Sequence, residues 1–212
     1  MRGLLAVLAL VLAATVAAAA DPLFNAVAAG DVAAVQSALA IGASVDSRAS
    51  DQATPLMAAA LADQTVIVEA LLDKGANVMA RNSGGFTTLH AAANAGSVPI
   101  AKLLLDKGAV LDDAQNKAGV TPLMVAGEGN HLELAEFLLA KGADVNHPEI
   151  RGYLPITRAI FKGNKDIVDS IKATEWRAHR RKFLAAKNGI SNVMQSANSW
   201  RADYARNTAR AF

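Results

Sequence analysis

The chain has 212 residues, of which 52% are hydrophobic, 5% aromatic and 19% charged, and its formal net charge is +2. This composition excludes a disordered or collagen-like chain. Because the sequence contains no cysteine, it also excludes structural disulfides, thiolate zinc sites, a cysteine nucleophile and a lipidated N-terminal cysteine.

The first twenty residues differ from the rest of the chain. A basic residue precedes an apolar run over residues 3–20, and Asp21 ends this run. Its most apolar part, residues 4–12, is about half as long as a helix that spans a bilayer. Ala18-Ala19-Ala20 matches the small-residue cleavage site of a secretory signal peptide. We therefore predict a signal peptide over residues 1–20 and export to a bacterial periplasm. The alternative is an uncleaved segment that anchors the protein in the inner membrane.

The chain after residue 21 contains an internal repeat. One set of apolar residues recurs every 33 or 34 positions, and a set of glycines follows the first four of them at a distance of 19 residues. The two sets are Leu23, Leu56, Leu89, Leu123 and Ile156, and Gly42, Gly75, Gly108 and Gly142. Two landmarks in one register indicate a repeat architecture, in which each unit buries its apolar surface against its neighbours.

The residues around these landmarks resemble the ankyrin repeat. The segment Thr54-Pro55-Leu56-Met57-Ala58-Ala59 has counterparts at residues 87–92 and 121–126, and Leu71-Leu72-Asp73-Lys74-Gly75 has one at residues 138–142. The resemblance covers about residues 22–172. It implies an all-α ankyrin-repeat solenoid of about five helix-turn-helix repeats with hairpin loops, at about residues 21–51, 52–84, 85–118, 119–151 and 152–172.

Local signals support this register. Thr54 is placed to cap a first helix, with proline following at the first helical position. The glycines that follow the second helices suit a left-handed residue that ends a helix. The first and fifth repeats depart from the motif and resemble capping repeats. Gln52 stands where later hairpins have glycine, which predicts a more open turn in that hairpin. One extra residue lies between Gly108 and Leu123 and predicts a bulge near residues 112–117.

The segment 173–212 has a different charge from the repeats. It holds eight basic and two acidic residues, a net charge of +6, whereas residues 21–172 hold 12 basic and 17 acidic residues, a net charge of −5. We predict a basic helical extension. Its second half carries the amphipathic stripe Val193, Ala197, Trp200 and Tyr204. We expect this stripe to cover the open end of the repeats; the alternatives are a basic arm for an acidic partner or for anionic lipid.

The sequence offers little that could carry catalysis. His90, His131, His147 and His179 show no metal-ligand spacing, and no hydrolase or metalloprotease motif is present. The resemblance implies a structural hydrogen bond between loops for His90. We interpret Asp112 and Asp113 as a solvated hairpin tip without a charged partner. The sequence therefore predicts a protein that is not an enzyme and uses no cofactor, metal or nucleic acid.

We predict a non-catalytic protein–protein interaction module in the bacterial envelope, acting as an accessory factor. The alternatives are an immunity protein that neutralises a delivered toxin, and an adaptor that uses its basic C-terminal helix at a membrane surface. The resemblance implies that hairpin tips and the concave face of the first helices bind another protein, and we expect a monomer. The hairpin candidates are Arg48, Arg81, Asn82, Asp113, Lys117, Glu149 and Arg151, and the helix candidates are Leu61, Asn94, Glu128, Phe161 and Lys162.

Overall fold

The computed structural model describes residues 21–182 and residue 184. The chain divides into two units, one ending at Ser170 and the other beginning at Ile171. Regular secondary structure in the described residues is helical throughout, with no strands, as predicted. None of the helices in this described part combines the length and the apolar character needed to cross a membrane.

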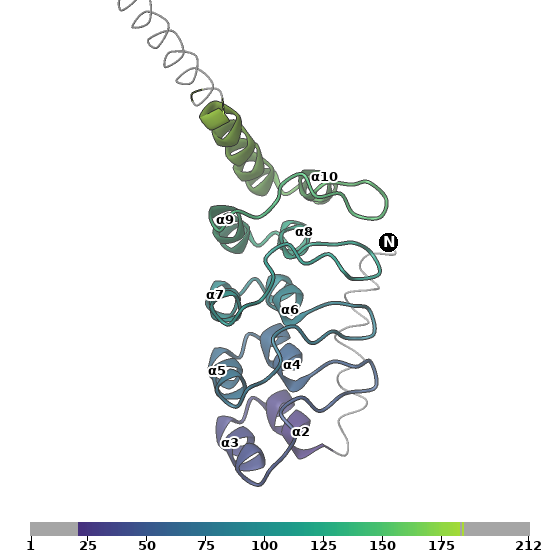
Figure 1. Ribbon diagram of the computed structural model, residues 1–212, viewed down its shortest axis with the longest axis vertical. Helices are drawn as coiled ribbons and strands as arrows, with labels where there is room; N and C mark the ends of the chain where they lie inside the picture. The colour runs from purple at the N-terminus through teal and green to yellow at the C-terminus, as the bar shows by residue number, and fades with distance from the viewer. Residues whose placement is uncertain (1–20, 183, 185–212) are drawn as a thin grey trace, which may run out of the picture. The chain divides into compact units, whose positions relative to one another are not determined.

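The first unit consists of helix pairs stacked in two rows (Figure 1). The first row contains α2 (Pro22–Ala29), α4 (Pro55–Leu61), α6 (Thr88–Ala95), α8 (Pro122–Glu128) and α10 (Pro155–Lys162). The second row contains α3 (Val32–Ala40), α5 (Thr65–Asp73), α7 (Val98–Asp106) and α9 (Leu132–Ala140), and residues 165–170 are also helical. Long hairpin loops project from the first row (Figure 1). The predicted solenoid of helix pairs is confirmed.

The helix boundaries follow from the predicted local signals. The Thr54 hydroxyl accepts a hydrogen bond from the Met57 backbone N–H at 3.2 Å, and Pro55 begins α4. The glycines that follow the second helices have positive φ, for example +83° at Gly75 and +93° at Gly108, a conformation that costs glycine little because it has no Cβ. Each pair therefore begins and ends where the sequence indicates.

The core lies between successive helix pairs. Leu71, Leu104 and Leu138 occupy equivalent positions of the second helices and have no exposed surface. Small side chains fill the first row, where Ala59 and Ala92 are also fully buried, so α4 packs directly against α6. No single pair could bury this surface alone, and the stack is the unit that folds.

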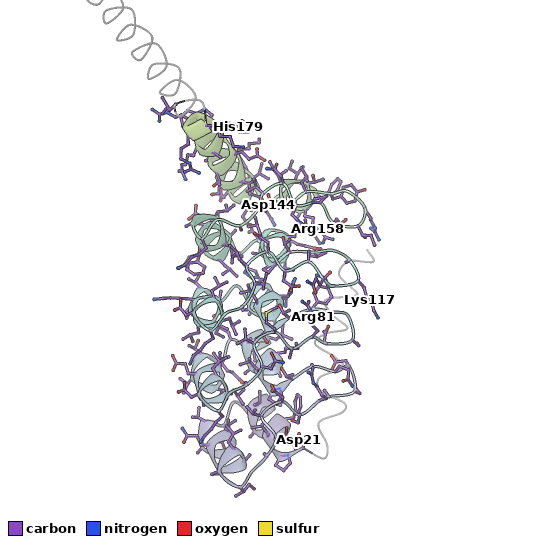
Figure 2. All side chains as sticks on the ribbon, viewed as in Figure 1. Asp21, Arg81, Lys117, Asp144, Arg158 and His179 are labelled. Atoms are coloured by element: carbon purple, nitrogen blue, oxygen red, sulfur yellow. The ribbon has the colours of Figure 1, made fainter. Side chains whose placement is uncertain are left out.

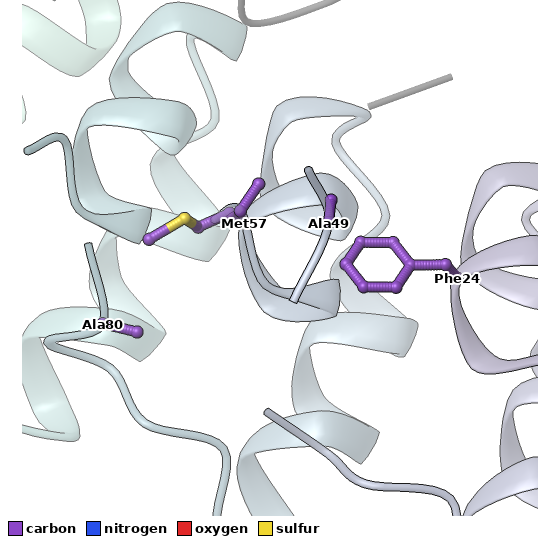
Figure 3. Packing of buried hydrophobic residues seen from close by; sticks show 5 residues of the cluster. Phe24, Ala49, Met57 and Ala80 are labelled. Atoms are coloured by element: carbon purple, nitrogen blue, oxygen red, sulfur yellow. The ribbon is translucent and has the colours of Figure 1, made fainter. Parts of the chain in front are cut away.

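A smaller cluster joins the first two hairpins to the first row. Phe24 of α2 and Met57 of α4 pack with Ala49, Ala53 and Ala80 of the hairpins, and all five are at most 6% exposed (Figure 3). The cluster lies where the hairpins meet the helices. It therefore fixes the hairpins relative to the first row.

The prediction of a more open turn at Gln52 is wrong. Gln52 adopts a φ of +65°, close to the +85° of Gly85 in the next hairpin. The Ala49 N–H donates to the Ala53 carbonyl at 3.0 Å, and the same closing bond joins Asn82 to Phe86 at 3.1 Å. This backbone shape is set by the closing hydrogen bonds, so the turn keeps it even without glycine.

The position of the extra residue in the third connection follows from the hydrogen bonds of two asparagines. The Asn82 side chain accepts hydrogen bonds from the N–H groups of Gly84 and Phe86, and Asn116 binds Ala118 and Val120 in the same way. The two asparagines are 34 residues apart, one more than the 33 residues that separate Gly75 from Gly108. The extra residue therefore lies between Gly108 and Asn116.

The second unit is helical over residues 171–182 and at residue 184. Within it, Trp176 is 62% exposed, and the Arg180 guanidinium lies 5.4 Å from the centre of its ring. The amphipathic stripe predicted between residues 193 and 204 lies outside the described residues, as does the predicted signal peptide at residues 1–20.

Candidate functional site

Arginines at one repeated position connect neighbouring hairpins. Arg48 donates from Nη1 to the carbonyls of Gln52, at 2.8 Å, and Arg81, at 3.0 Å. Arg81, 33 residues later, donates from Nη1 to the Gly85 carbonyl at 3.0 Å, the counterpart of the first of these bonds. It also binds both oxygens of Asp113 in the next hairpin, at 2.9 and 2.5 Å. This arginine position therefore holds successive hairpins together.

The interpretation of a solvated tip without a charged partner is wrong for Asp113. The Asp113 side chain is only 2% exposed. Burial raises the pKa of Asp113, but the hydrogen bonds and charge of Arg81 outweigh this effect and hold that pKa below its ordinary value. Asp112 accepts a hydrogen bond from the Asp144 N–H at 3.0 Å, and burial raises its pKa. These partners lie about one repeat away in sequence, so inspection of the local sequence missed them.

The structural role expected of His90 is confirmed. Its ring is buried, Nδ1 lies 3.2 Å from the Thr87 backbone N–H, and Nε2 lies 2.9 Å from the Val120 carbonyl. Because an N–H can only donate and a carbonyl can only accept, this arrangement requires a neutral ring protonated on Nε2. Burial lowers the pKa of His90, which also favours the neutral ring. His90 thus joins the start of α6 to the loop before α8.

Polar side chains between the two helices of a pair make a second set of inter-repeat bonds. His131 Nε2 lies 2.9 Å from the Asn94 carbonyl, and Asn164 Nδ2 donates to the Gly127 carbonyl at 2.6 Å. Both bonds span 37 residues and reach the first helix of the preceding pair. His131 therefore has the same structural explanation as His90.

Arg158 of α10 is the centre of an ion-pair network that the sequence did not predict. It donates to Glu128 of α8 at 2.6 Å and to Glu149 of the last hairpin, and Lys162 lies 3.4 Å from Glu128. Figure 2 marks Arg158, together with Arg81 and Lys117. The network fixes α10 to the preceding repeat and neutralises both carboxylates.

The predicted contact residues therefore separate into two groups. Asp113 and Glu149 are buried in ion pairs, so they hold hairpins in place and do not offer their side chains to a partner; Arg81 is engaged with Asp113. Arg48, Lys117, Arg151, Phe161 and Lys162 are exposed, and Leu61, Asn94 and Glu128 are partly exposed.

Two of the predicted residues, Leu61 and Asn82, meet in an apolar groove. The groove lies between the first and second hairpins and the helices α4 and α6, and its lining consists of Ala53, Met57, Ala58, Leu61, Asn82, Phe86, Thr87 and Ala91. Met57 and Ala53 also belong to the cluster in Figure 3, so the floor of the groove is part of the core. Sequence reasoning missed Phe86. A signal was present, because Ala53, Phe86, Val120 and Tyr153 each follow the positive-φ residue of a hairpin.

A second apolar feature lies in the last repeat. The rings of Tyr153 and Phe161 meet edge to face, with centroids 5.4 Å apart and an interplanar angle of 89°. Phe161 is 68% exposed and Ile150, at the tip of the same hairpin, is 76% exposed. Large apolar side chains gathered on the surface in this way are typical of interaction sites.

The arrangement matches known families of repeats. A family model described as ankyrin repeats (3 copies) matches residues 23–114, and another described as ankyrin repeats (many copies) matches residues 104–159. The chain belongs to the ankyrin-repeat family. A comparison with curated proteins found no match. Ankyrin repeats are generally protein–protein interaction modules and typically have no catalytic activity.

Within residues 21–182 and 184, no three side chains of the histidine, cysteine, aspartate or glutamate type are grouped so that they could hold a metal ion. His90 and His131 are engaged with backbone carbonyls, and the groove and the Tyr153–Phe161 pair are both apolar.

Proposed function

We propose that the protein is a non-catalytic binding module of the bacterial envelope that holds another protein as an accessory factor. The observation that carries the proposal is the groove lined by Leu61 and Phe86, which exposes apolar side chains beside hairpins held rigid by the Arg48 and Arg81 bonds. A rigid apolar groove binds a partner at a low cost in conformational entropy. Apolar groups in such grooves commonly supply most of the affinity.

The proposal predicts that a charge in the groove abolishes binding. Leu61→Glu places a carboxylate where a partner would bury apolar surface, so retention of the partner should fall at least about tenfold. The experiment is purification of the tagged full chain from its host, with quantitative mass spectrometry of the proteins that stay bound.

Val66→Glu is the matched control. Val66 lies on α5 of the same repeat and is 58% exposed, so the variant introduces the same charge on the second row. It should retain the partner as the wild-type protein does. Equal retention by the wild-type and Leu61→Glu proteins would refute the groove as the binding site.

The cellular location is part of the proposal. It is supported by the apolar run over residues 3–20 and by the Ala18-Ala19-Ala20 site. We expect the protein isolated from its host to begin at or near Asp21. Intact-mass measurement of that protein tests this, and a mass that still includes residues 1–20 would contradict cleavage and favour the uncleaved anchor.

A further inference from the structure

We propose that the last two hairpins and α10 bind a protein segment in which an aromatic or large aliphatic residue is flanked by aspartate or glutamate. The inference rests on the proposed function, because it names the chemistry of the partner at one part of the same surface. We define the acidic-segment site as Lys117, Ile150, Arg151, Tyr153 and Phe161.

The apolar part of this site has a defined shape. The hairpin closes through the Glu149 N–H and the Tyr153 carbonyl at 3.0 Å, which puts Ile150 and Arg151 at its tip. Tyr153 is 40% exposed and stands edge-on to Phe161 of α10. A partner's ring can join this pair in the edge-to-face or offset geometry that aromatic side chains favour.

The hairpin tips around the apolar part are basic. The Ile150 N–H donates to the Ala118 carbonyl at 3.1 Å, so the tip that carries Lys117 lies beside the tip that carries Arg151. Residues 115–129 and 147–163 together hold four basic and two acidic side chains, a net charge of +2, although residues 21–172 have a net charge of −5. The site is therefore positive within an acidic domain.

The distribution of ion pairs increases this contrast. Both acidic side chains of these segments, Glu128 and Glu149, are bound to Arg158. Among the described residues, no carboxylate lies within ion-pair distance of Lys117 or Arg151. These two cations are free to meet a partner's carboxylates at the exposed rim, where charges guide association and set specificity more than they add affinity.

Charge also selects among the possible occupants. The segment 173–212 of this chain has a net charge of +6, so the basic tips would repel it. A partner segment with acidic residues beside its apolar anchor matches both the free cations and the exposed rings. An anionic membrane would match the charge, but it offers no discrete side chain to complete the Tyr153 and Phe161 pair.

The test is selection from a phage library of random dodecapeptides on the full chain. We expect enriched peptides to carry an aromatic or large aliphatic residue next to aspartate or glutamate. Synthetic copies should bind Phe161→Ala at least about tenfold more weakly in fluorescence anisotropy. The double variant Lys117→Glu and Arg151→Glu should bind them roughly fivefold more weakly, because exposed ion pairs are individually weak.

Matched controls separate charge at the site from charge elsewhere. The double variant Lys74→Glu and Lys102→Glu makes the same change at exposed positions of the second row, and it should bind as the wild-type protein does. Circular dichroism and melting temperatures of all variants establish that they are folded. If Phe161→Ala is not folded, Phe161→Leu takes its place, because leucine keeps an apolar side chain but removes the ring.

The outcomes distinguish this inference from the proposed function. Enriched peptides with basic or uncharged flanks, or equal binding to Phe161→Ala, would overturn the acidic-segment site. Peptides whose binding depends on Leu61 but not on Phe161 would overturn it while leaving the proposed function intact, and a selection without any binding peptide would contradict both. Sedimentation with phosphatidylglycerol vesicles that requires Phe161 would show a lipid surface instead and would also overturn the inference.

Discussion

Replacing Leu104 with alanine is expected to lower the free energy of unfolding by about 2 to 5 kcal/mol. Leu104 lies on α7, the central second-row helix, and has no exposed surface. The substitution removes buried apolar contacts and leaves a cavity between layers that relax only partly. In a repeat array the damage also weakens coupling to both neighbouring pairs. Chemical denaturation monitored by circular dichroism measures the effect.

Lys102→Ala is the control for this prediction. Lys102 lies on the same helix and is exposed, so its replacement should change the free energy of unfolding by no more than about 0.5 kcal/mol. Similar effects of Leu104→Ala and Lys102→Ala would contradict the register of the repeat, since they would show that Leu104 is not between the layers.

Replacing His90 with leucine should lower the free energy of unfolding by about 1 to 3 kcal/mol at neutral pH, because the Thr87 N–H loses its acceptor in a buried place. The loss should shrink as the pH falls. Burial lowers the pKa of His90 in the folded protein below its ordinary value of 6.5. The unfolded chain therefore takes up a proton near pH 6.5 while the folded ring stays neutral, so the contribution of His90 is complete above that pH and is lost as the pH falls toward the folded pKa.

The measurement is the difference in unfolding free energy between the wild-type and His90→Leu proteins at pH 7, 6 and 5. Carboxylates that titrate in this range are common to both proteins and cancel in the difference. We expect the difference to decrease steadily with falling pH. A difference that stays constant, or increases, would contradict a neutral buried ring at position 90.

Much of the fold could be predicted because its signals are local. Thr54 followed by Pro55 begins α4, and Gly75 ends the second helix of that repeat, wherever the rest of the chain lies. The period of 33 or 34 residues then places the helix pairs in a stack. The misjudged turn at Gln52 also has a local cause, because glycine is the residue that best tolerates positive φ but not the only one that adopts it.

The site could be predicted only in part, because its bonds join different repeats. Arg81 and Asp113 are 32 residues apart and lie in different hairpins. The exposure of Lys117, Arg151 and Phe161 could be predicted from their positions in the repeat. The groove could not be predicted, because the exposure of Phe86 depends on the side chains of neighbouring repeats, and these side chains differ from one repeat to the next.

Site-specific photo-cross-linking in the host tests whether the groove binds a partner protein. A photoreactive phenylalanine derivative is placed at position 61, in the groove, or at position 66, on α5 of the same repeat, in otherwise unchanged full-length protein. We expect illumination to join position 61, and not position 66, to one host protein, identified by mass spectrometry. Cross-links to that protein from position 66 alone, or equally from both positions, would contradict binding through the groove between the hairpins and the first row.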